Sequence, residues 1–198
     1  MATYVALGDS ASIDDYTGVV GGGAPAQLAR KLNLELVDLA RDGNTTEGVC
    51  ADLARIPPAV ELVTLTAGGN DLLLDESPNA IMRRLERTAG HLDRIGARVI
   101  INTVYDPSDG DDALGARELG LPLIAVGELR RRLDATNAGI RELAARHGFL
   151  LADLEQVFRG HGVASRDPWF VQVIEPNLRG ATAIANRWHE LLQEPLRE

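Results

Sequence analysis

The sequence has a single cysteine, Cys50, among its 198 residues, so it can form no internal disulfide. It also lacks an apolar stretch near the roughly 20 residues that a membrane-spanning helix needs, which argues against a membrane span. Basic residues are few: 20 lysines and arginines stand against 29 aspartates and glutamates, a formal net charge of −9. Only residues 130–132 form a short basic run, so nucleic acid is not an expected partner. No histidine or cysteine pair has the spacing of a zinc site.

The N-terminal residues 1–4 lack the basic and then apolar pattern of a secretory signal, so we expect the protein in the cytoplasm. Its length fits one domain spanning residues 1–198, and folding could bury about 70% of the surface of the unfolded chain. No internal repeat, low-complexity tract or linker interrupts it. The oligomeric state is not indicated by the sequence.

Short runs rich in valine, leucine and isoleucine alternate with longer amphipathic segments. The runs predict strands over 4–7, 34–38, 61–66, 98–104 and 149–152. The amphipathic segments predict helices over 24–32, 46–55, 78–95, 127–147 and 177–192. Asn33, Gly96 and Gly148 stand just before three of the strands, where a left-handed helix C-cap is expected. Because the strands are apolar at nearly every position, we predict a three-layer α/β/α sandwich with a five-stranded parallel sheet.

Unusual polar residues follow the predicted strands. Parallel sheets bind ligands beyond the carboxyl ends of their strands, so these loops are where chemistry is expected. Ser10 follows the first strand and offers a hydroxyl nucleophile, which needs a base to take its proton and donors to stabilise the resulting oxyanion. Gly43 after the second strand can offer an unobstructed backbone N–H, and Asn70 after the third a side-chain amide. Alone, each is an ordinary cap or turn residue; together at successive strand ends they predict an acyl-transfer site.

Three blocks in this order resemble the SGNH, or GDSL, hydrolase family: residues 4–10 (YVALGDS), 43–46 (GNTT) and 62–72 (LVTLTAGGNDL). The strand-ending residues 104–107 (VYDP) are also of that type. The resemblance implies a flavodoxin-like sheet and a serine esterase or acylhydrolase acting on a small-molecule acyl ester without metal or organic cofactor. It implies that Ser10 is the nucleophile, that the Ser10 and Gly43 N–H groups and the Asn70 amide form the oxyanion hole, and that Asp9 and Asp71 support them.

The sequence departs from the family pattern at the fourth block. There the family places Asp-x-x-His-Pro ahead of the last helix, whereas this chain has residues 172–176 (QVIEP). Glu175 therefore occupies the position of the catalytic base and Gln172 that of the acid that orients it.

Three accounts of the base follow. In the first, His161 enters from the preceding loop as the base and Glu175 orients its ring, or Asp167 does so in its place. In the second, Glu175 takes the serine proton itself, which requires burial to raise its pKa. In the third, the protein has lost hydrolysis and only binds an acyl or carbohydrate ligand. The first account is the one we adopt from the sequence.

Two further patterns have competing interpretations. Residues 21–26 (GGGAPA) contain a loose G-x-G-x-x-A followed by a helix and a strand that ends at Asp38, which suggests dinucleotide binding. That motif should follow a first strand directly, however, and the best strand ends at Leu7. The aspartates between 106 and 112 lack the spacing of a calcium loop, so we expect a solvated loop there.

Overall fold

The structure is a computed structural model that describes residues 2–194. Five parallel strands form its main sheet in the order β2-β1-β3-β4-β5. Their bounds are β1 (Thr3–Gly8), β2 (Glu35–Asp38), β3 (Leu62–Thr66), β4 (Arg98–Asn102) and β5 (Leu150–Ala152). This order is that of the flavodoxin-like class. In it β2 lies on one side of β1, and β3, β4 and β5 follow on the other side. The predicted five-stranded parallel sheet is confirmed.

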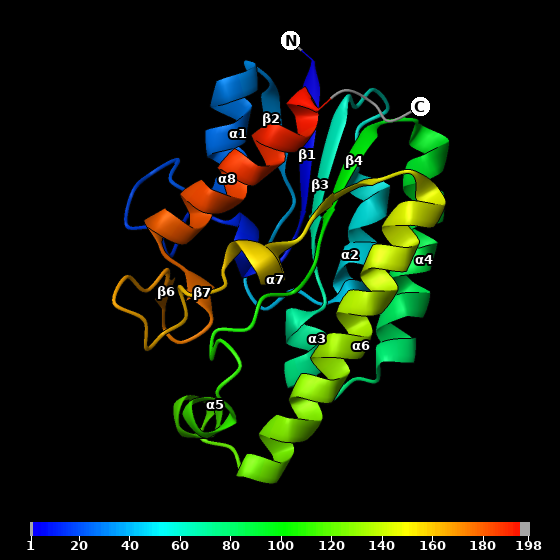
Figure 1. Ribbon diagram of the computed structural model, residues 1–198. Coiled ribbons are helices and arrows are strands. Elements are labelled where there is room, and N and C mark those ends of the chain that lie inside the picture. The colour runs from blue at the N-terminus through cyan, green and yellow to red at the C-terminus, as the bar shows by residue number, and fades with distance from the viewer. Residues whose placement is uncertain (1, 195–198) are drawn as a thin grey trace.

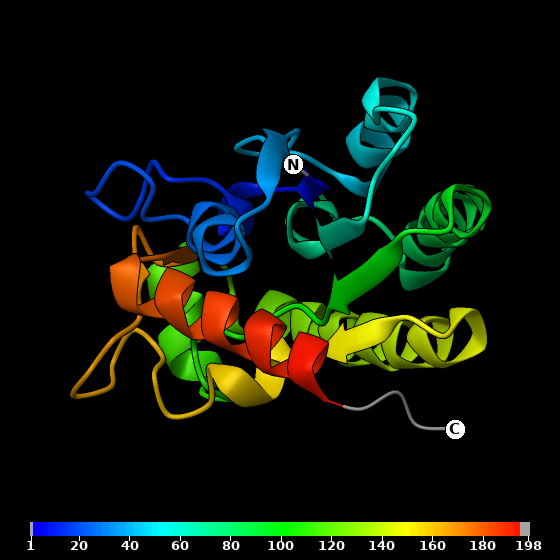
Figure 2. The same ribbon diagram turned by 90° about the horizontal axis from the view of Figure 1, so that it is seen from above.

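Helices cover both faces of the sheet (Figure 1; Figure 2). One face carries α1 (Ala24–Leu32) and α8 (Leu178–Gln193), and the other carries α2 (Thr46–Asp52), α4 (Pro78–Ile95) and α6 (Leu123–His147). Shorter elements lie in the loops: η1 (Ser10–Ser12), η2 (Leu53–Arg55), α3 (Gly69–Leu73), α5 (Asp112–Leu119), α7 (Leu154–Val157), β6 (Phe170–Val171) and β7 (Glu175–Pro176). Across residues 2–194, no helix combines the length and apolar character needed to cross a membrane.

The core lies in two apolar clusters because alternate side chains of each strand point to opposite faces of the sheet. Val5 and Leu7 of β1 pack toward α2, α4 and α6, whereas Tyr4 and Ala6 pack toward α1 and α8. Trp188 of α8 is fully buried and its indole N–H donates a 2.8 Å hydrogen bond to the Asn102 side chain at the end of β4. This hydrogen bond thus fixes α8, the last helix, to the sheet at the carboxyl-terminal end of β4.

Helix ends were predictable where a single residue determines the backbone. Asn33, Gly96 and Gly148 adopt the left-handed conformation that ends α1, α4 and α6, with φ of 54°, 73° and 65°. The helix over 127–147 begins earlier than predicted, at Leu123 directly after Pro122. Proline commonly precedes or opens a helix because it lacks the N–H that would have no partner there.

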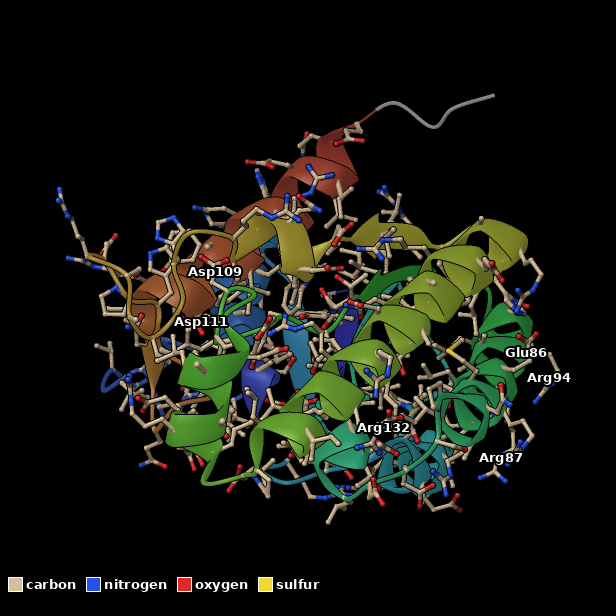
Figure 3. All side chains as sticks on the ribbon, turned by 60° about the horizontal axis from the view of Figure 1, so that its bottom comes forward. Glu86, Arg87, Arg94, Asp109, Asp111 and Arg132 are labelled. Carbon is tan, nitrogen blue, oxygen red and sulfur yellow. The ribbon has the colours of Figure 1, made fainter. Side chains whose placement is uncertain are left out.

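The solvated loop predicted between 106 and 112 is present, with residues 106–111 outside helices and strands and Asp109 and Asp111 exposed, but a short helix begins at Asp112. The Asp111 carboxylate caps α5 by accepting hydrogen bonds from the backbone N–H groups of Ala113 and Leu114. Asp106 and Asp112 both form ion pairs with Arg130 of α6. The aspartates therefore hold α5 against α6 beside the ends of the strands, where Figure 3 labels Asp111.

A histidine between two carboxylates predicts a pH-dependent contribution to stability on the α4–α6 side of the molecule, where Figure 3 labels Glu86. The Nδ1 atom of His147 lies 2.6 Å from Asp93 Oδ2, and Nε2 lies 2.9 Å from Glu86 Oε1. Burial lowers the pKa of His147, but hydrogen bonds to the two carboxylates outweigh it and the net pKa is raised. The stabilising charge is therefore present below the ordinary histidine pKa and is lost as pH rises through the raised one.

We expect His147→Gln to lower the free energy of unfolding by about 0.5–1 kcal/mol near pH 6, a small value because both carboxylates are half exposed. Near pH 9 the difference from the natural sequence should shrink. Urea denaturation at the two pH values measures it. An equal difference at both would contradict a charge-dependent contribution.

Candidate active site

The loops after β1, β2 and β3 meet at one edge of the sheet, the lower end in Figure 1. Because β1 lies between β2 and β3, the residues that follow these three strands are brought side by side. This edge, next to a point where the chain reverses its direction across the sheet, is where open parallel sheets bind ligands.

Ser10 begins the short turn η1 directly after β1. Asp9 caps this turn, its carboxylate accepting a hydrogen bond of 3.2 Å from the Ala11 N–H. Gly8 is needed at the strand end because its φ is +143° and a side chain there would collide with Thr66 of β3. No hydrogen bond within residues 2–194 uses the Ser10 N–H. The turn therefore presents both a hydroxyl and an unused backbone donor.

Side-chain amides tie the three loops together. Asn44 donates a 3.0 Å hydrogen bond to the carbonyl of Gly8, and Asn70 donates one of 2.9 Å to the carbonyl of Asn44. Asp71 is fully buried and accepts hydrogen bonds from both the N–H and the hydroxyl of Thr46, at 2.9 and 2.6 Å. Asp71 therefore fixes the start of α2 and with it the Gly43 loop.

The three predicted oxyanion donors lie in these linked loops. Gly43 is exposed with φ of +67°, a conformation that favours glycine, and no hydrogen bond of the described chain uses its N–H. Asn70 has two amide N–H donors and spends one on Asn44, which leaves the second. Together with the Ser10 N–H, the edge offers three donors without assigned partners.

Glu175 lies in β7, which packs against η1, the turn that carries Ser10. The residue is only 7% exposed, and its Oε2 atom is buried with no hydrogen-bond partner in the described part of the chain. Burial raises the pKa of Glu175, a hydrogen bond with Ser10 lowers it, and the nearby charge of Asp42 raises it, with a net rise. A buried carboxylate beside a hydroxyl is a stronger base than an exposed one.

Asp9, the predicted supporting residue next to the nucleophile, is also buried. Burial raises the pKa of Asp9 to about 7, partly offset by its hydrogen bonds to Ala11 and Thr66, while Glu175 adds a small rise. The Asp9 carboxylate accepts a hydrogen bond from Ala11 within the turn, and the Asp9 N–H donates one to Thr66 at the end of β3, which agrees with a role in shaping that turn.

The structure gives the His161 ring partners other than Ser10, so its role as the catalytic base stays a prediction. Its ring stacks on Trp169, with ring centroids 3.5 Å apart, and its Nδ1 lies 3.2 Å from the carbonyl oxygen of Asp167. Within residues 2–194, no hydrogen bond or ion pair joins it to Ser10 or Glu175. The backbone N–H of Trp169 donates a hydrogen bond to the His161 carbonyl. The loop therefore closes on itself and holds the imidazole against Trp169.

A largely apolar pocket opens beside Ser10 and Asn70. It runs between α3, α5 and α6 and the loop that precedes β7. Its apolar wall includes Leu72, Leu119, Val126, Leu129, Leu133 and Val173. This wall was not predicted from the sequence because α5 was not predicted, although Asp111 and Gly120 are the capping residues of a short helix.

The glycine-rich segment 21–23 does not have the context of a dinucleotide site. No strand of the structure directly precedes it, since β1 ends at Gly8. The Asp14 carboxylate accepts hydrogen bonds from the N–H groups of Gly21 and Gly23. Those donors therefore close a loop within the protein.

The chain is similar to known proteins in both sequence and fold. Residues 6–183 match the model of the GDSL-like lipase/acylhydrolase family. A lipase from Streptomyces rimosus is 25% identical over an alignment 216 positions long, which covers 87% of this chain and 77% of that protein. A lipolytic protein of the G-D-S-L family from Veillonella parvula superimposes with a TM-score of 0.77 at 18% identity, over 98% of this chain and 100% of that one. An acetylxylan esterase from Geobacillus stearothermophilus superimposes with a TM-score of 0.74 at 15% identity, over 100% and 96%.

The family match spans most of the chain, and the structural likenesses support the same fold. The protein belongs to the GDSL-like lipase/acylhydrolase family and is a hydrolase that acts on ester bonds.

Proposed function

We propose that the protein is a serine esterase in which Ser10 attacks the acyl carbon and Glu175 takes the serine proton. The observation that carries this proposal is the buried carboxyl of Glu175 on a strand that packs against the Ser10 turn, with one oxygen that has no hydrogen-bond partner among the described residues. The family pattern has a histidine at this position, so the Glu175 carboxylate takes the place of an imidazole as the general base.

The reaction has two halves. In the first, the Ser10 proton passes to Glu175 as the serine oxygen bonds to the acyl carbon. The oxyanion that forms accepts hydrogen bonds from the N–H groups of Ser10 and Gly43 and from the Asn70 amide. Glu175 then returns the proton to the departing alcohol, which leaves an acyl group on Ser10. In the second half, a water molecule gives a proton to Glu175 as its oxygen attacks the acyl carbon. Glu175 then returns that proton to the Ser10 oxygen as the bond between this oxygen and the acyl carbon breaks, which releases the acid and restores both residues.

The pocket beside Ser10 supports a substrate with an apolar acyl group. Its wall is formed mostly by leucine and valine side chains of α3, α5 and α6, and burial of apolar surface contributes roughly 25 cal/mol per Å². Longer acyl chains should therefore bind more tightly than acetyl until the pocket is filled.

Nitrophenyl esters of increasing acyl length test the proposed activity. We expect turnover of these esters and a KM that falls from the acetyl to the butanoyl and hexanoyl substrates. Binding of the esters without release of nitrophenol would contradict an esterase and would favour the alternative of a ligand-binding protein on this fold.

Asn70→Ala tests the proposed oxyanion hole. We expect kcat to fall by about 10²- to 10³-fold with little change in KM, because the amide stabilises charge that develops only in the transition state. Asn79→Ala, which truncates an exposed asparagine on α4, is the matched control and should leave kcat unchanged. A kcat for Asn70→Ala close to that of the control would remove this residue from the oxyanion hole.

A further inference from the structure

The family pattern orients its base with an acid three residues earlier, and this chain has Gln172 there. Gln172 is exposed, and its side chain makes no hydrogen bond with any residue between 2 and 194. It lies in the tight turn between β6 and β7, with φ of +46°. Some other group must therefore hold Glu175 against Ser10.

The turn that leads into Glu175 is strained. Val173 has φ of +71°, a conformation that a β-branched residue rarely adopts, and the N–H of Ile174 bonds back to the carbonyl of Gln172 at 2.9 Å. Strain of this kind persists only where surrounding contacts impose it, and it gathers at functional sites. The pairing of Val171 with Glu175 across the β6–β7 hairpin fixes one side of the turn.

Tyr105 fixes the other side. Its hydroxyl donates a 2.9 Å hydrogen bond to the carbonyl of Ile174, the residue directly before Glu175. Its ring stacks on Phe158, with centroids 4.7 Å apart, and contacts Phe170 of β6 at 5.2 Å. The phenol therefore joins the end of β4 to the hairpin that carries the proposed base.

We propose that Tyr105 is the positioning residue for Glu175, replacing through the backbone the orienting role that an acid at 172 has in the family pattern. This inference rests on the proposed function, because it assigns Glu175 as the base. The hydrogen bond to the Ile174 carbonyl keeps the strained turn closed and the carboxyl directed at Ser10. Without it, the turn can relax and Glu175 can move toward water.

Tyr105→Phe tests this role because it removes only the hydroxyl and keeps the stacked ring. We expect kcat to fall about tenfold with KM nearly unchanged, the effect of losing one hydrogen bond that orients the base. The acid limb of the pH profile of kcat/KM should also move to lower pH, because a carboxyl that reaches water loses the pKa rise that burial causes. A residue with only a structural role would not move that limb.

Tyr4→Phe is the matched control. Tyr4 is another buried tyrosine with one hydroxyl contact, 2.7 Å from the Thr64 hydroxyl, but it lies in β1 away from the strand ends. It should leave kcat and the acid limb unchanged, with both variants assayed below their melting temperatures. A Tyr105→Phe enzyme with the kcat and pH profile of this control would overturn the proposal.

Glu175→Gln, assayed in parallel, separates the two proposals. If it loses activity while Tyr105→Phe keeps full kcat, the positioning role is wrong and the base assignment stands. If Glu175→Gln keeps full kcat, both proposals are overturned. Both proposals are supported if both variants lose activity and the remaining activity of Tyr105→Phe has an acid limb that is shifted to lower pH.

Discussion

Ser10→Ala is expected to lower kcat for nitrophenyl ester hydrolysis by about four orders of magnitude, because no other hydroxyl can form the acyl-enzyme at that point. The residual rate should come from the oxyanion donors and from substrate binding. KM should change little, since the pocket wall is formed by other side chains. Steady-state kinetics on a single short-chain ester measure the effect.

Ser12→Ala is the control for that experiment. Ser12 lies in the same turn η1, and its hydroxyl is 2.9 Å from the Thr66 hydroxyl. Removal of this hydroxyl should lower the stability of the protein and have a much smaller effect on kcat. Equal rates in Ser10→Ala and the natural sequence would contradict the serine mechanism, whatever the outcome for Ser12→Ala.

Glu175→Gln is expected to lower kcat by about a thousandfold, because the amide has the shape of the carboxyl but cannot accept the serine proton. His161→Ala should leave kcat within about twofold, since its ring contacts Trp169 and Asp167 and forms no hydrogen bond with Ser10 within residues 2–194. The reverse result, an inactive His161→Ala and an active Glu175→Gln, would restore the histidine as the base.

The pH dependence of kcat/KM is a second test of which residue is the base. Burial raises the pKa of Glu175, and the carboxylate must be ionised to act, so kcat/KM should rise with pH and reach its plateau above the ordinary range for glutamate. Asp9→Asn should retain this acid limb, although the pKa of Asp9 is raised to about 7 by burial. An acid limb that disappears in Asp9→Asn would assign it to Asp9.

Much of the fold could be predicted because its signals are local. The apolar runs of the strands, the proline at the start of α4 and the left-handed caps at Asn33 and Gly96 each act within a few residues. The short helix α5 was missed because its aspartates resemble a solvated loop until Arg130, which is distant in sequence, is placed beside them.

The candidate site could be predicted in part for a related reason. Ser10, Gly43 and Asn70 end neighbouring strands, and the sheet topology alone brings their loops together. The choice between His161 and Glu175 as the proposed base could not be made in this way, since the two residues are close in sequence and nothing local indicates that the His161 loop folds back on Trp169. The burial of Glu175 and its link to Tyr105 depend on a hairpin that no local pattern indicated.

Covalent labelling with a fluorophosphonate tests the central claim most directly, because the reagent reacts with an activated serine and its adduct can be located by peptide mass spectrometry. The account predicts one adduct per chain, on Ser10, formed much more slowly in Glu175→Gln than in the natural sequence or in His161→Ala. An adduct on another residue, or a labelling rate in Glu175→Gln equal to that of the natural sequence, would contradict it.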